Sequence, residues 1–259
     1  MQKVHAKKYL GQHFLIDLSI AQKIVNSLSQ KNSNVLEIGP GMGVLTQYLL
    51  KIENINLKLV EIDVESVEYL KENLNINEQN IYQLDFLKTD LNNLFNSQKF
   101  CVIGNFPYNI SSQIFFKILN YKDSVTEIVC MLQREVAKRL ASKPGNKNYG
   151  ILSVFLQAFY DIEYLFTVDE YVFNPPPKVK SGVIRLKRNN VVSLSCDEKL
   201  FRIIVKTTFN QRRKTIWNSI RNIQFKHDNL RDHQFMKLRP EQLSVQDFVD
   251  LTNLVAANY

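Results

Sequence analysis

The chain has 259 residues, of which 45% are hydrophobic, and its formal net charge is +8. This length allows one large core, or one core with a small appendage. The three cysteines stand singly, which excludes a disulfide scaffold and a cysteine-bound metal. No apolar run approaches the roughly 20 residues of a membrane span, and no signal-peptide core follows the first lysines. We therefore expect a cytoplasmic protein, with no metal and no membrane contact, whose positive charge serves a polyanionic partner.

A glycine-rich loop follows the first apolar strand pattern. Residues 34–43 read NVLEIGPGMG and residues 44–50 continue in a helical pattern, so a strand, a loop and a helix occur in order. Gly39, Gly41 and Gly43 permit a tight turn and a close approach to a ligand, as in nucleotide-binding βαβ units. Their spacing is G-x-G-x-G, whereas the dinucleotide fingerprint is G-x-G-x-x-G. The loop therefore disfavours NAD and favours a ligand without a pyrophosphate.

Two acidic residues follow the next two strand patterns. Glu61 lies at the end of the second one, about 20 residues after the loop, where a carboxylate accepts hydrogen bonds from both hydroxyls of a ribose. Asp85 follows the strand predicted over residues 81–84 and is placed to accept a hydrogen bond from an adenine amino group. Ligands of open α/β sheets bind at the carboxyl ends of the strands. The order of these residues therefore predicts a pocket for S-adenosylmethionine.

Residues 104–108 read GNFPY and follow another apolar strand pattern. The side-chain oxygen of Asn105 and the carbonyl of Phe106 provide two acceptors for a planar amine, such as the amino group of adenine. Pro107 disfavours helix at Phe106, and Tyr108 offers a face on which a base can stack. An ordinary turn after a strand has the same composition. The position of this segment after the predicted cofactor strands favours an acceptor site.

The second half of the chain has a different pattern. Strands are predicted over residues 161–168 and 182–186, so we expect a mostly parallel sheet with an antiparallel ending. We place a domain boundary near residue 190, which divides an α/β domain (1–190) from a helical domain (191–259). A basic cluster is predicted to lie in one helix of the second domain and in its neighbour. Its members are Arg212, Arg213, Lys214 and Arg221. We expect the cluster to bind a nucleic-acid backbone, although a solvated helix face has the same composition.

Six ordered segments resemble the KsgA-type ribosomal RNA adenine dimethyltransferases of the small ribosomal subunit. They are GQHFL (11–15), EIGPGMG (37–43), GNFPYNISS (104–112), MLQREVA (131–137), FNPPPKV (173–179) and FNQRRKT (209–215). The resemblance spans nearly the whole chain. It implies a Rossmann-like class I methyltransferase sheet with a small all-helical C-terminal domain, S-adenosylmethionine as the methyl donor, and a role in ribosome biogenesis. The implied substrate is a pair of adjacent adenosines near the 3′ end of 16S rRNA, in the small subunit or its precursor. We expect the protein to act as a monomer.

The resemblance also implies roles for individual residues. The cofactor is expected to contact His13, Leu15, Gly39, Gly41, Glu61, Asp85 and Asn105. Two positions depart from the common family pattern, which has Asn in place of His13 and Leu or Ile in place of Phe106. Tyr108 and Phe173 are expected to stack on the target base after it leaves its own stack. A plain core role is the alternative for Phe173.

The expected reaction is a direct in-line transfer of the sulfonium methyl group to the exocyclic nitrogen of adenine. Asn105 and the Phe106 carbonyl accept its N–H groups, so that positioning is the main catalytic effect. Three alternatives stay open. A large-subunit rRNA methylase of the macrolide-resistance type should lack the QRRK segment (211–214), a non-enzymatic ribosome-assembly or nucleic-acid-binding factor would tolerate loss of Asn105 or Glu61, and a small-molecule or protein methyltransferase does not require the basic charge.

Overall fold

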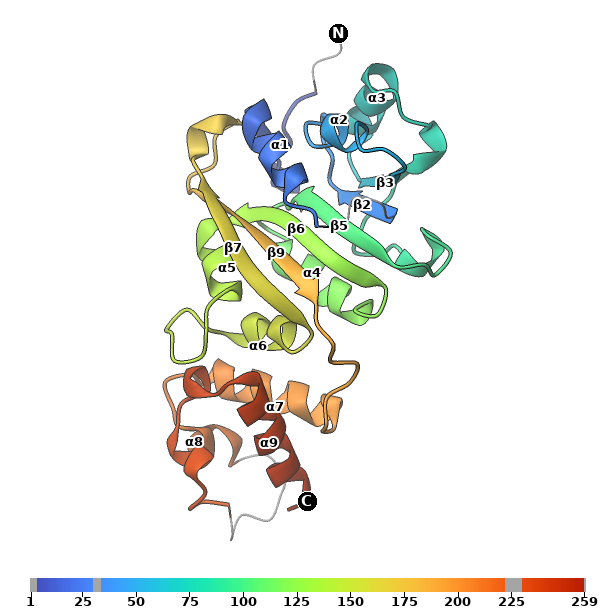
Figure 1. Cartoon of the computed structure of the whole chain (residues 1–259). Helices are drawn as coiled ribbons and strands as arrows, with labels where there is room; N and C mark the ends of the chain where they lie inside the picture. Colours follow the sequence, from blue (N-terminus) through green and yellow to red (C-terminus); the bar gives the residue numbers. More distant parts are fainter. Residues whose placement is uncertain (1–3, 30–33, 222–229, 259) are drawn as a thin grey trace. The chain divides into compact units, whose positions relative to one another are not determined.

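Figure 1 shows the computed structural model, which describes residues 4–29, 34–221 and 230–258. The chain forms two compact units. The first comprises Met1–Lys138 and Asp161–Arg188, and the second comprises Arg139–Tyr160 and Asn189–Tyr259. The chain last passes between the units after Arg188, close to the boundary predicted near residue 190. Residues 139–160, which we expected in the first domain, group with the second unit.

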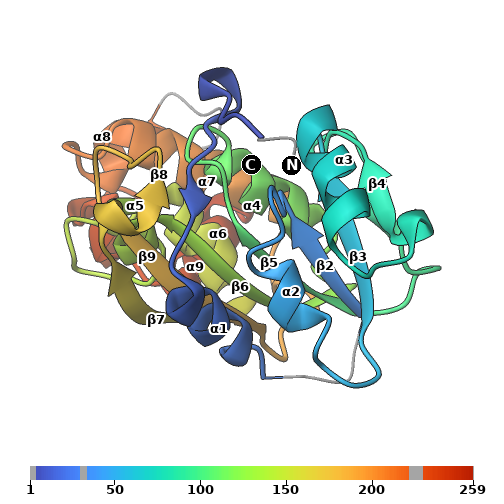
Figure 2. The same ribbon diagram turned by 90° about the horizontal axis from the view of Figure 1, so that it is seen from above.

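The first unit is built on a seven-stranded sheet with the order β4-β3-β2-β5-β6-β9-β7. The strands are β2 (Asn34–Ile38), β3 (Asn56–Glu61), β4 (Ile81–Gln83), β5 (Phe100–Asn105), β6 (Val125–Gln133), β7 (Tyr160–Val168) and β9 (Ser181–Arg188). The neighbours from β4 to β6 pair in parallel, and β9 runs antiparallel to β6. This arrangement confirms the mostly parallel sheet with an antiparallel ending. Figure 2 shows β5, β2 and β3 side by side.

Helices cover both faces of this sheet, with α1 and α2 on one face and α4 on the other (Figure 1). The helices of the unit are α1 (Leu18–Asn26), α2 (Thr46–Leu49), α3 (Val64–Asn73), α4 (Ser111–Asn120) and α5 (Arg134–Leu140). The central strands are apolar along almost their whole length, as expected for parallel strands that are buried on both faces. A separate two-stranded sheet pairs β1 (Phe14–Leu15) with β8 (Phe173–Asn174) in antiparallel fashion. It ties the start of the chain to the proline-rich turn.

The second unit is helical. It contains α6 (Ile151–Gln157), α7 (Glu198–Asn210), α8 (Ile216–Ile220) and α9 (Val245–Ala256), with short 3₁₀ turns at Gln234–Lys237 and Pro240–Gln242. The Asp197 side chain begins α7 by accepting hydrogen bonds from two backbone N–H groups of its first turn. One face of α7 is buried, and the ring of Phe209 lies 5.9 Å from that of Phe248 on α9, measured between centroids. Nowhere in the described ranges is a helix long and apolar enough to cross a membrane.

The basic cluster lies outside the helices, so its predicted helical placement is wrong. α7 ends at Asn210 and α8 begins at Ile216, which leaves Arg212, Arg213 and Lys214 in the turn between them. Arg221 directly follows α8. The physical reason is that residues 211–214 are all polar and offer no apolar side chain to continue the buried face of α7. The Lys214 N–H instead closes a turn onto the Gln211 carbonyl at 2.7 Å.

The close approach of β5 to β2 depends on Gly104. A Cβ atom there would lie 2.5 Å from the Ile38 carbonyl oxygen, a backbone atom that cannot rotate away. We therefore expect Gly104→Ala to lower the free energy of unfolding by about 1–3 kcal/mol, as for other overpacked sites. Urea denaturation measures the change. Gly150→Ala is the matched control, because its Cβ would meet neighbours at ordinary distances of 3.7 and 3.9 Å. Equal stability of the two variants would contradict the close contact.

Candidate active site

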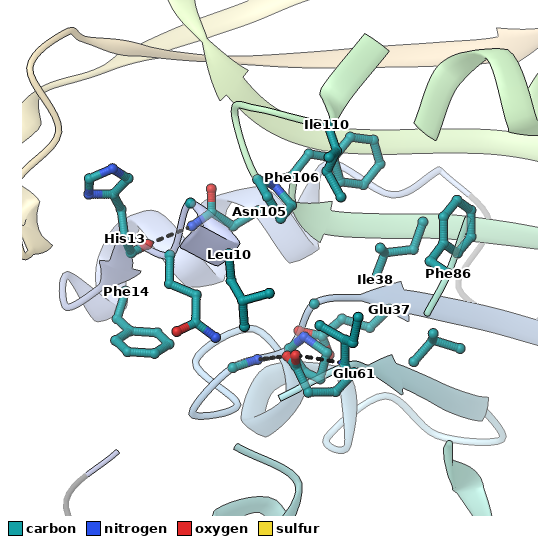
Figure 3. Close-up of a pocket in the computed structure, with 18 of the residues that line it drawn as sticks. Leu10, His13, Phe14, Glu37, Ile38, Glu61, Phe86, Asn105, Phe106 and Ile110 are labelled. Carbon is teal, nitrogen blue, oxygen red and sulfur yellow. Dashed lines mark hydrogen bonds between the residues drawn. The ribbon is translucent and has the colours of Figure 1, made fainter. Parts of the chain in front are cut away.

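A cavity of about 250 Å³ opens at the carboxyl ends of β2, β3, β4 and β5 (Figure 3). Most of the site residues predicted from the sequence line it. These are His13, Leu15, Gly39, Gly41, Glu61, Asp85, Asn105, Phe106 and Tyr108. The rest of the wall comes from other residues of the same segments, which lie within 9–15, 37–45, 60–62, 84–87 and 105–110. The structure therefore gathers residues from five separate segments around one space.

The glycine loop adopts left-handed backbone angles, which are compatible with the tight turn expected from its sequence. Gly39, Gly41 and Gly43 have φ angles of +63°, +55° and +73°, which side chains other than glycine rarely adopt. The Gly39 N–H donates to the Val60 carbonyl at 2.9 Å, so the loop is fastened to the end of β3. The loop thereby presents backbone to the cavity at Gly39 and Gly41, without side chains at these two positions.

Glu61 is buried at the end of β3 and is 4% exposed. One carboxylate oxygen accepts the Gly41 N–H at 3.0 Å, and the other accepts the N–H groups of Ile62 and Asp63, each at 2.9 Å. Burial raises the pKa of Glu61, although these three donors oppose the effect. Because an ionised carboxylate has about four acceptor positions, Glu61 still has capacity for a ligand hydroxyl.

Glu37 is a cavity residue to which the sequence analysis assigned no role. It lies in β2, is 1% exposed and accepts a hydrogen bond from the Thr46 hydroxyl at 2.7 Å. Burial raises the pKa of Glu37 to about 8, and the charge of nearby Glu61 adds to that rise. The protonated form therefore dominates at pH 7. The sequence does offer a signal for Glu37, because it is an acidic residue inside an otherwise apolar strand pattern.

Asn105 ends β5 with its side chain at the edge of the cavity. Its amide nitrogen donates to the His13 carbonyl at 2.9 Å (Figure 3). This hydrogen bond leaves the amide oxygen as the group that is free to accept from a ligand. The next residue, Phe106, donates its backbone N–H to the Met131 carbonyl at 2.9 Å, and its fully buried ring meets Phe115 edge to face. The ring of Phe106 thus anchors the turn that carries the predicted acceptor carbonyl.

Tyr108 is held at the same edge by a short hydrogen bond between its hydroxyl and that of Ser181. Burial raises the pKa of Tyr108, so its hydroxyl stays protonated at neutral pH. The Tyr108 ring lies 5.6 Å from the His13 ring, centroid to centroid, with 30° between their planes. His13 in turn donates from Nδ1 to the Pro175 carbonyl at 2.8 Å. In Figure 3 its imidazole points away from Glu61, so the backbone of His13, rather than its ring, faces the site.

Phe173, the other predicted stacking residue, is buried. It begins β8, is 2% exposed and packs in the hydrophobic core. It is absent from the described lining of the cavity. The structure therefore places Phe173 in the core, which was the alternative to base stacking.

The start of the chain is clamped beside the cavity by charged and polar contacts. The Lys7 ammonium contacts the buried Asp63 and lies 3.2 Å from Glu65, and the Gln12 amide donates to Asp63 at 3.0 Å. Burial raises the pKa of Asp63, but the hydrogen bonds from Lys7, Gln12 and Ser66 outweigh this effect and leave that pKa lowered. The residues between Lys7 and Gln12 thus become part of the cavity wall.

Asp85 reaches the cavity from the loop after β4. One of its carboxylate oxygens accepts the Leu87 N–H at 2.9 Å, which orients the side chain. Among the described residues, Asp85 forms an ion pair with Lys88 at 3.7 Å, which lies at the surface. Within the described part of the chain, no group of three or more His, Cys, Asp or Glu side chains is arranged to hold a metal ion.

Known proteins are similar to this chain over nearly its whole length. A family model described as "Ribosomal RNA adenine dimethylase" matches residues 3–257. A protein of Phocaeicola vulgatus named "Ribosomal RNA small subunit methyltransferase A" is 56% identical over 99% of this chain and 92% of its own length. The protein of the same name from Cytophaga hutchinsonii is 57% identical over 99% of both chains.

Solved structures give the same fold. A dimethyladenosine transferase from Plasmodium falciparum superposes with a TM-score of 0.79 at 25% identity, over 95% of this chain and 98% of the other. The 23S rRNA methyltransferase ErmE superposes with a TM-score of 0.68 at 24% identity, over 93% and 99% of the two chains. The predicted Rossmann-like class I methyltransferase fold is therefore confirmed. Since the family model covers nearly the whole sequence, this chain belongs to the ribosomal RNA adenine dimethylase family.

Proposed function

We propose that this protein uses S-adenosylmethionine to dimethylate the N6 amines of two adjacent adenosines near the 3′ end of 16S rRNA. Its substrate is the small ribosomal subunit or a precursor of it, so the protein contributes to ribosome biogenesis. The observation that carries the proposal is the Asn105 amide, whose oxygen is left free to accept beside the cavity. The names of the relatives from Phocaeicola and Cytophaga support the small subunit as the target.

The cavity residues fit S-adenosylmethionine. Glu61 retains acceptor capacity for a ribose hydroxyl, and Asp85 is placed to accept from the adenine amino group of the cofactor. The glycine loop offers backbone for close contact. When bound, S-adenosylmethionine supplies an electrophilic methyl group on a sulfonium. The acidic lining suits this cationic centre, because neither Lys nor Arg is found among the described residues that line the cavity.

The protein contributes mainly by holding the acceptor amine. The Asn105 oxygen and the Phe106 carbonyl accept the two N6–H groups, which aims the nitrogen lone pair at the methyl group. Tyr108, restrained by Ser181, stacks on the unstacked adenine, an interaction worth roughly 1–3 kcal/mol. The alkylated nitrogen is acidic and loses its proton to water, so no side-chain base is required.

The alternatives are less well supported. The likeness to ErmE, at 24% identity, concerns the fold and leaves the target subunit open. The full-length relatives above 50% identity carry the small-subunit name. A purely structural assembly factor has no need for an oriented Asn105 or for a buried Glu61, and both are in place. A role in subunit assembly is compatible with the enzymatic one.

Asn105→Ala should reduce methyl transfer at least about 100-fold, because the acceptor amine loses its positioning oxygen. Incorporation of labelled methyl groups into small subunits from cells that lack the protein measures the effect. Asn34→Ala is the matched control, because Asn34 begins β2 at the opposite edge of the same sheet. We expect the control to retain activity and both variants to fold. Near-normal turnover by Asn105→Ala would refute the proposed mechanism.

Glu61→Gln should weaken cofactor binding by at least tenfold, since hydrogen bonds to a charged acceptor are each worth about 1.5–3 kcal/mol. Calorimetric titration with S-adenosylmethionine gives the affinity directly. The control is Glu68→Gln, which makes the same chemical change on the exposed surface of α3. If both variants bind the cofactor as the wild type does, Glu61 has no part in the site.

We also propose that the basic cluster of Arg212, Arg213, Lys214 and Arg221 binds the rRNA backbone. Arg212 already donates to the Lys147 carbonyl at 2.8 Å, so Arg213 and Lys214, both exposed, give the cleaner test. Reversing both to Glu should weaken subunit binding and flatten its salt dependence by about 0.7–0.9 per lost phosphate contact. Cofactor affinity should not change.

A control for that charge change is the double variant Lys199→Glu/Lys206→Glu, on exposed positions of α7 in the same unit. It alters the net charge equally. Equal effects of the two double variants would mean that overall charge, rather than the turn, governs subunit binding.

A further inference from the structure

A second hollow lies at the carboxyl end of β6. Its volume is about 320 Å³, and three cationic side chains line it: Arg134, Lys178 and Lys180. Glu135, Glu170 and Gln133 complete its polar lining. We call this hollow the basic notch. It has no residue in common with the cofactor cavity.

The strand register places the basic notch next to the acceptor site. Asn105 pairs with Met131 on β6, and Gln133 lies two residues further along that strand. Gln133 pairs with Ser181 of β9, whose hydroxyl is bonded to that of Tyr108. Because β5 and β6 are parallel neighbours, the notch lies at the same edge of the sheet as Asn105, one strand over and two residues further along.

The cations of the basic notch are available to a ligand. Lys178 is exposed and forms no salt bridge within the described residues. Arg134 pairs with its chain neighbour Glu135 at 3.2 Å, and Lys180 pairs with Asp169 at 2.6 Å. Both pairs are at the surface, where ion pairs contribute about 0–1 kcal/mol. A phosphate group can therefore replace these partners at little cost.

Glu170 restricts the kind of ligand. Its Oε2 atom is shielded from solvent and has no hydrogen-bond partner in the described structure. A phosphodiester or a sulfate alone brings no hydrogen-bond donor and would leave this acceptor unsatisfied. A ribonucleotide offers both a phosphate for the cations and a 2′-hydroxyl donor for Glu170. The combination of groups therefore favours RNA backbone over phosphate alone.

We propose that the basic notch binds the sugar and phosphate of a nucleotide adjoining the target adenosine, and so sets the register of the RNA at the acceptor site. The inference rests on the proposed function and extends it to a backbone subsite. Phosphate contacts of this kind position a nucleic acid without reading its sequence. In this case they would decide which adenosine reaches Asn105.

The test uses the full-length protein and an RNA fragment from the 3′ end of 16S rRNA that contains the two adjacent adenosines. Lys178→Ala should bind this RNA about fivefold more weakly, the value of one phosphate contact in water. Its salt slope should fall by about 0.7 if the strand is single. Lys99→Ala, at an exposed position directly before β5 and at the opposite edge of the sheet, should match the wild type. Cofactor affinity should be equal in all three proteins.

A second arm tests the hydroxyl contact. The wild type should bind the RNA more tightly than DNA of the same sequence, and Glu170→Gln should lose part of that preference. Wild-type affinity and salt slope in Lys178→Ala, with normal methyl transfer by the wild type, would overturn the inference alone. Failure of the wild type to methylate this RNA and the small subunit would overturn the proposed function, and the inference with it.

Discussion

The hydrogen bond from the Asn105 amide nitrogen to the His13 carbonyl is the contact on which the proposed acceptor site depends. A carboxamide presents either an acceptor or a donor, and this bond fixes the oxygen as the acceptor. It also links the end of β5 to the start of the chain, which Lys7 and Gln12 fasten to Asp63. Loss of the contacts of Lys7 and Gln12 with Asp63 would therefore disturb the orientation of Asn105, although these residues are far from Asn105 in the sequence.

Burial of two acids shapes the cofactor side of the cavity. Glu37 and Glu61 are both nearly inaccessible, and burial raises the pKa of each. They differ in their donors, since Glu61 accepts three backbone N–H groups and Glu37 accepts one hydroxyl. Backbone donors favour the ionised form. At pH 7, Glu37 is thus mainly neutral, with a pKa of about 8, so it adds little repulsion to the charge available at Glu61.

Local sequence predicted the parts of the site whose signal lies within a few residues. The apolar run before GNFPY predicted β5 and the turn at Asn105, and the glycine spacing predicted a tightly turning loop. Long-range contacts were not predictable in this way. The Lys7–Asp63 contact joins residues 56 positions apart, and nothing near either residue indicates the other. The predicted helix at the basic turn is wrong because charges alone do not indicate a helix. A packed helix also requires apolar residues at a regular spacing, which residues 211–214 lack.

Acidic and basic groups lie in separate regions along one edge of the sheet, beside the proposed sites for the methyl donor and the RNA. In the cavity, the carboxylates of Glu61 and Asp85 would suit the cationic sulfonium of the proposed methyl donor, whereas Glu37 is mainly neutral at pH 7. One strand further on, the basic notch presents its cations, which suit a phosphate. The net charge of +8 is a sum over the whole chain, so it indicates a polyanionic partner but does not show the separate acidic and basic regions. Under the proposed function, the cofactor's sulfonium and the RNA phosphate would thus each lie beside groups of opposite charge, near the same Asn105.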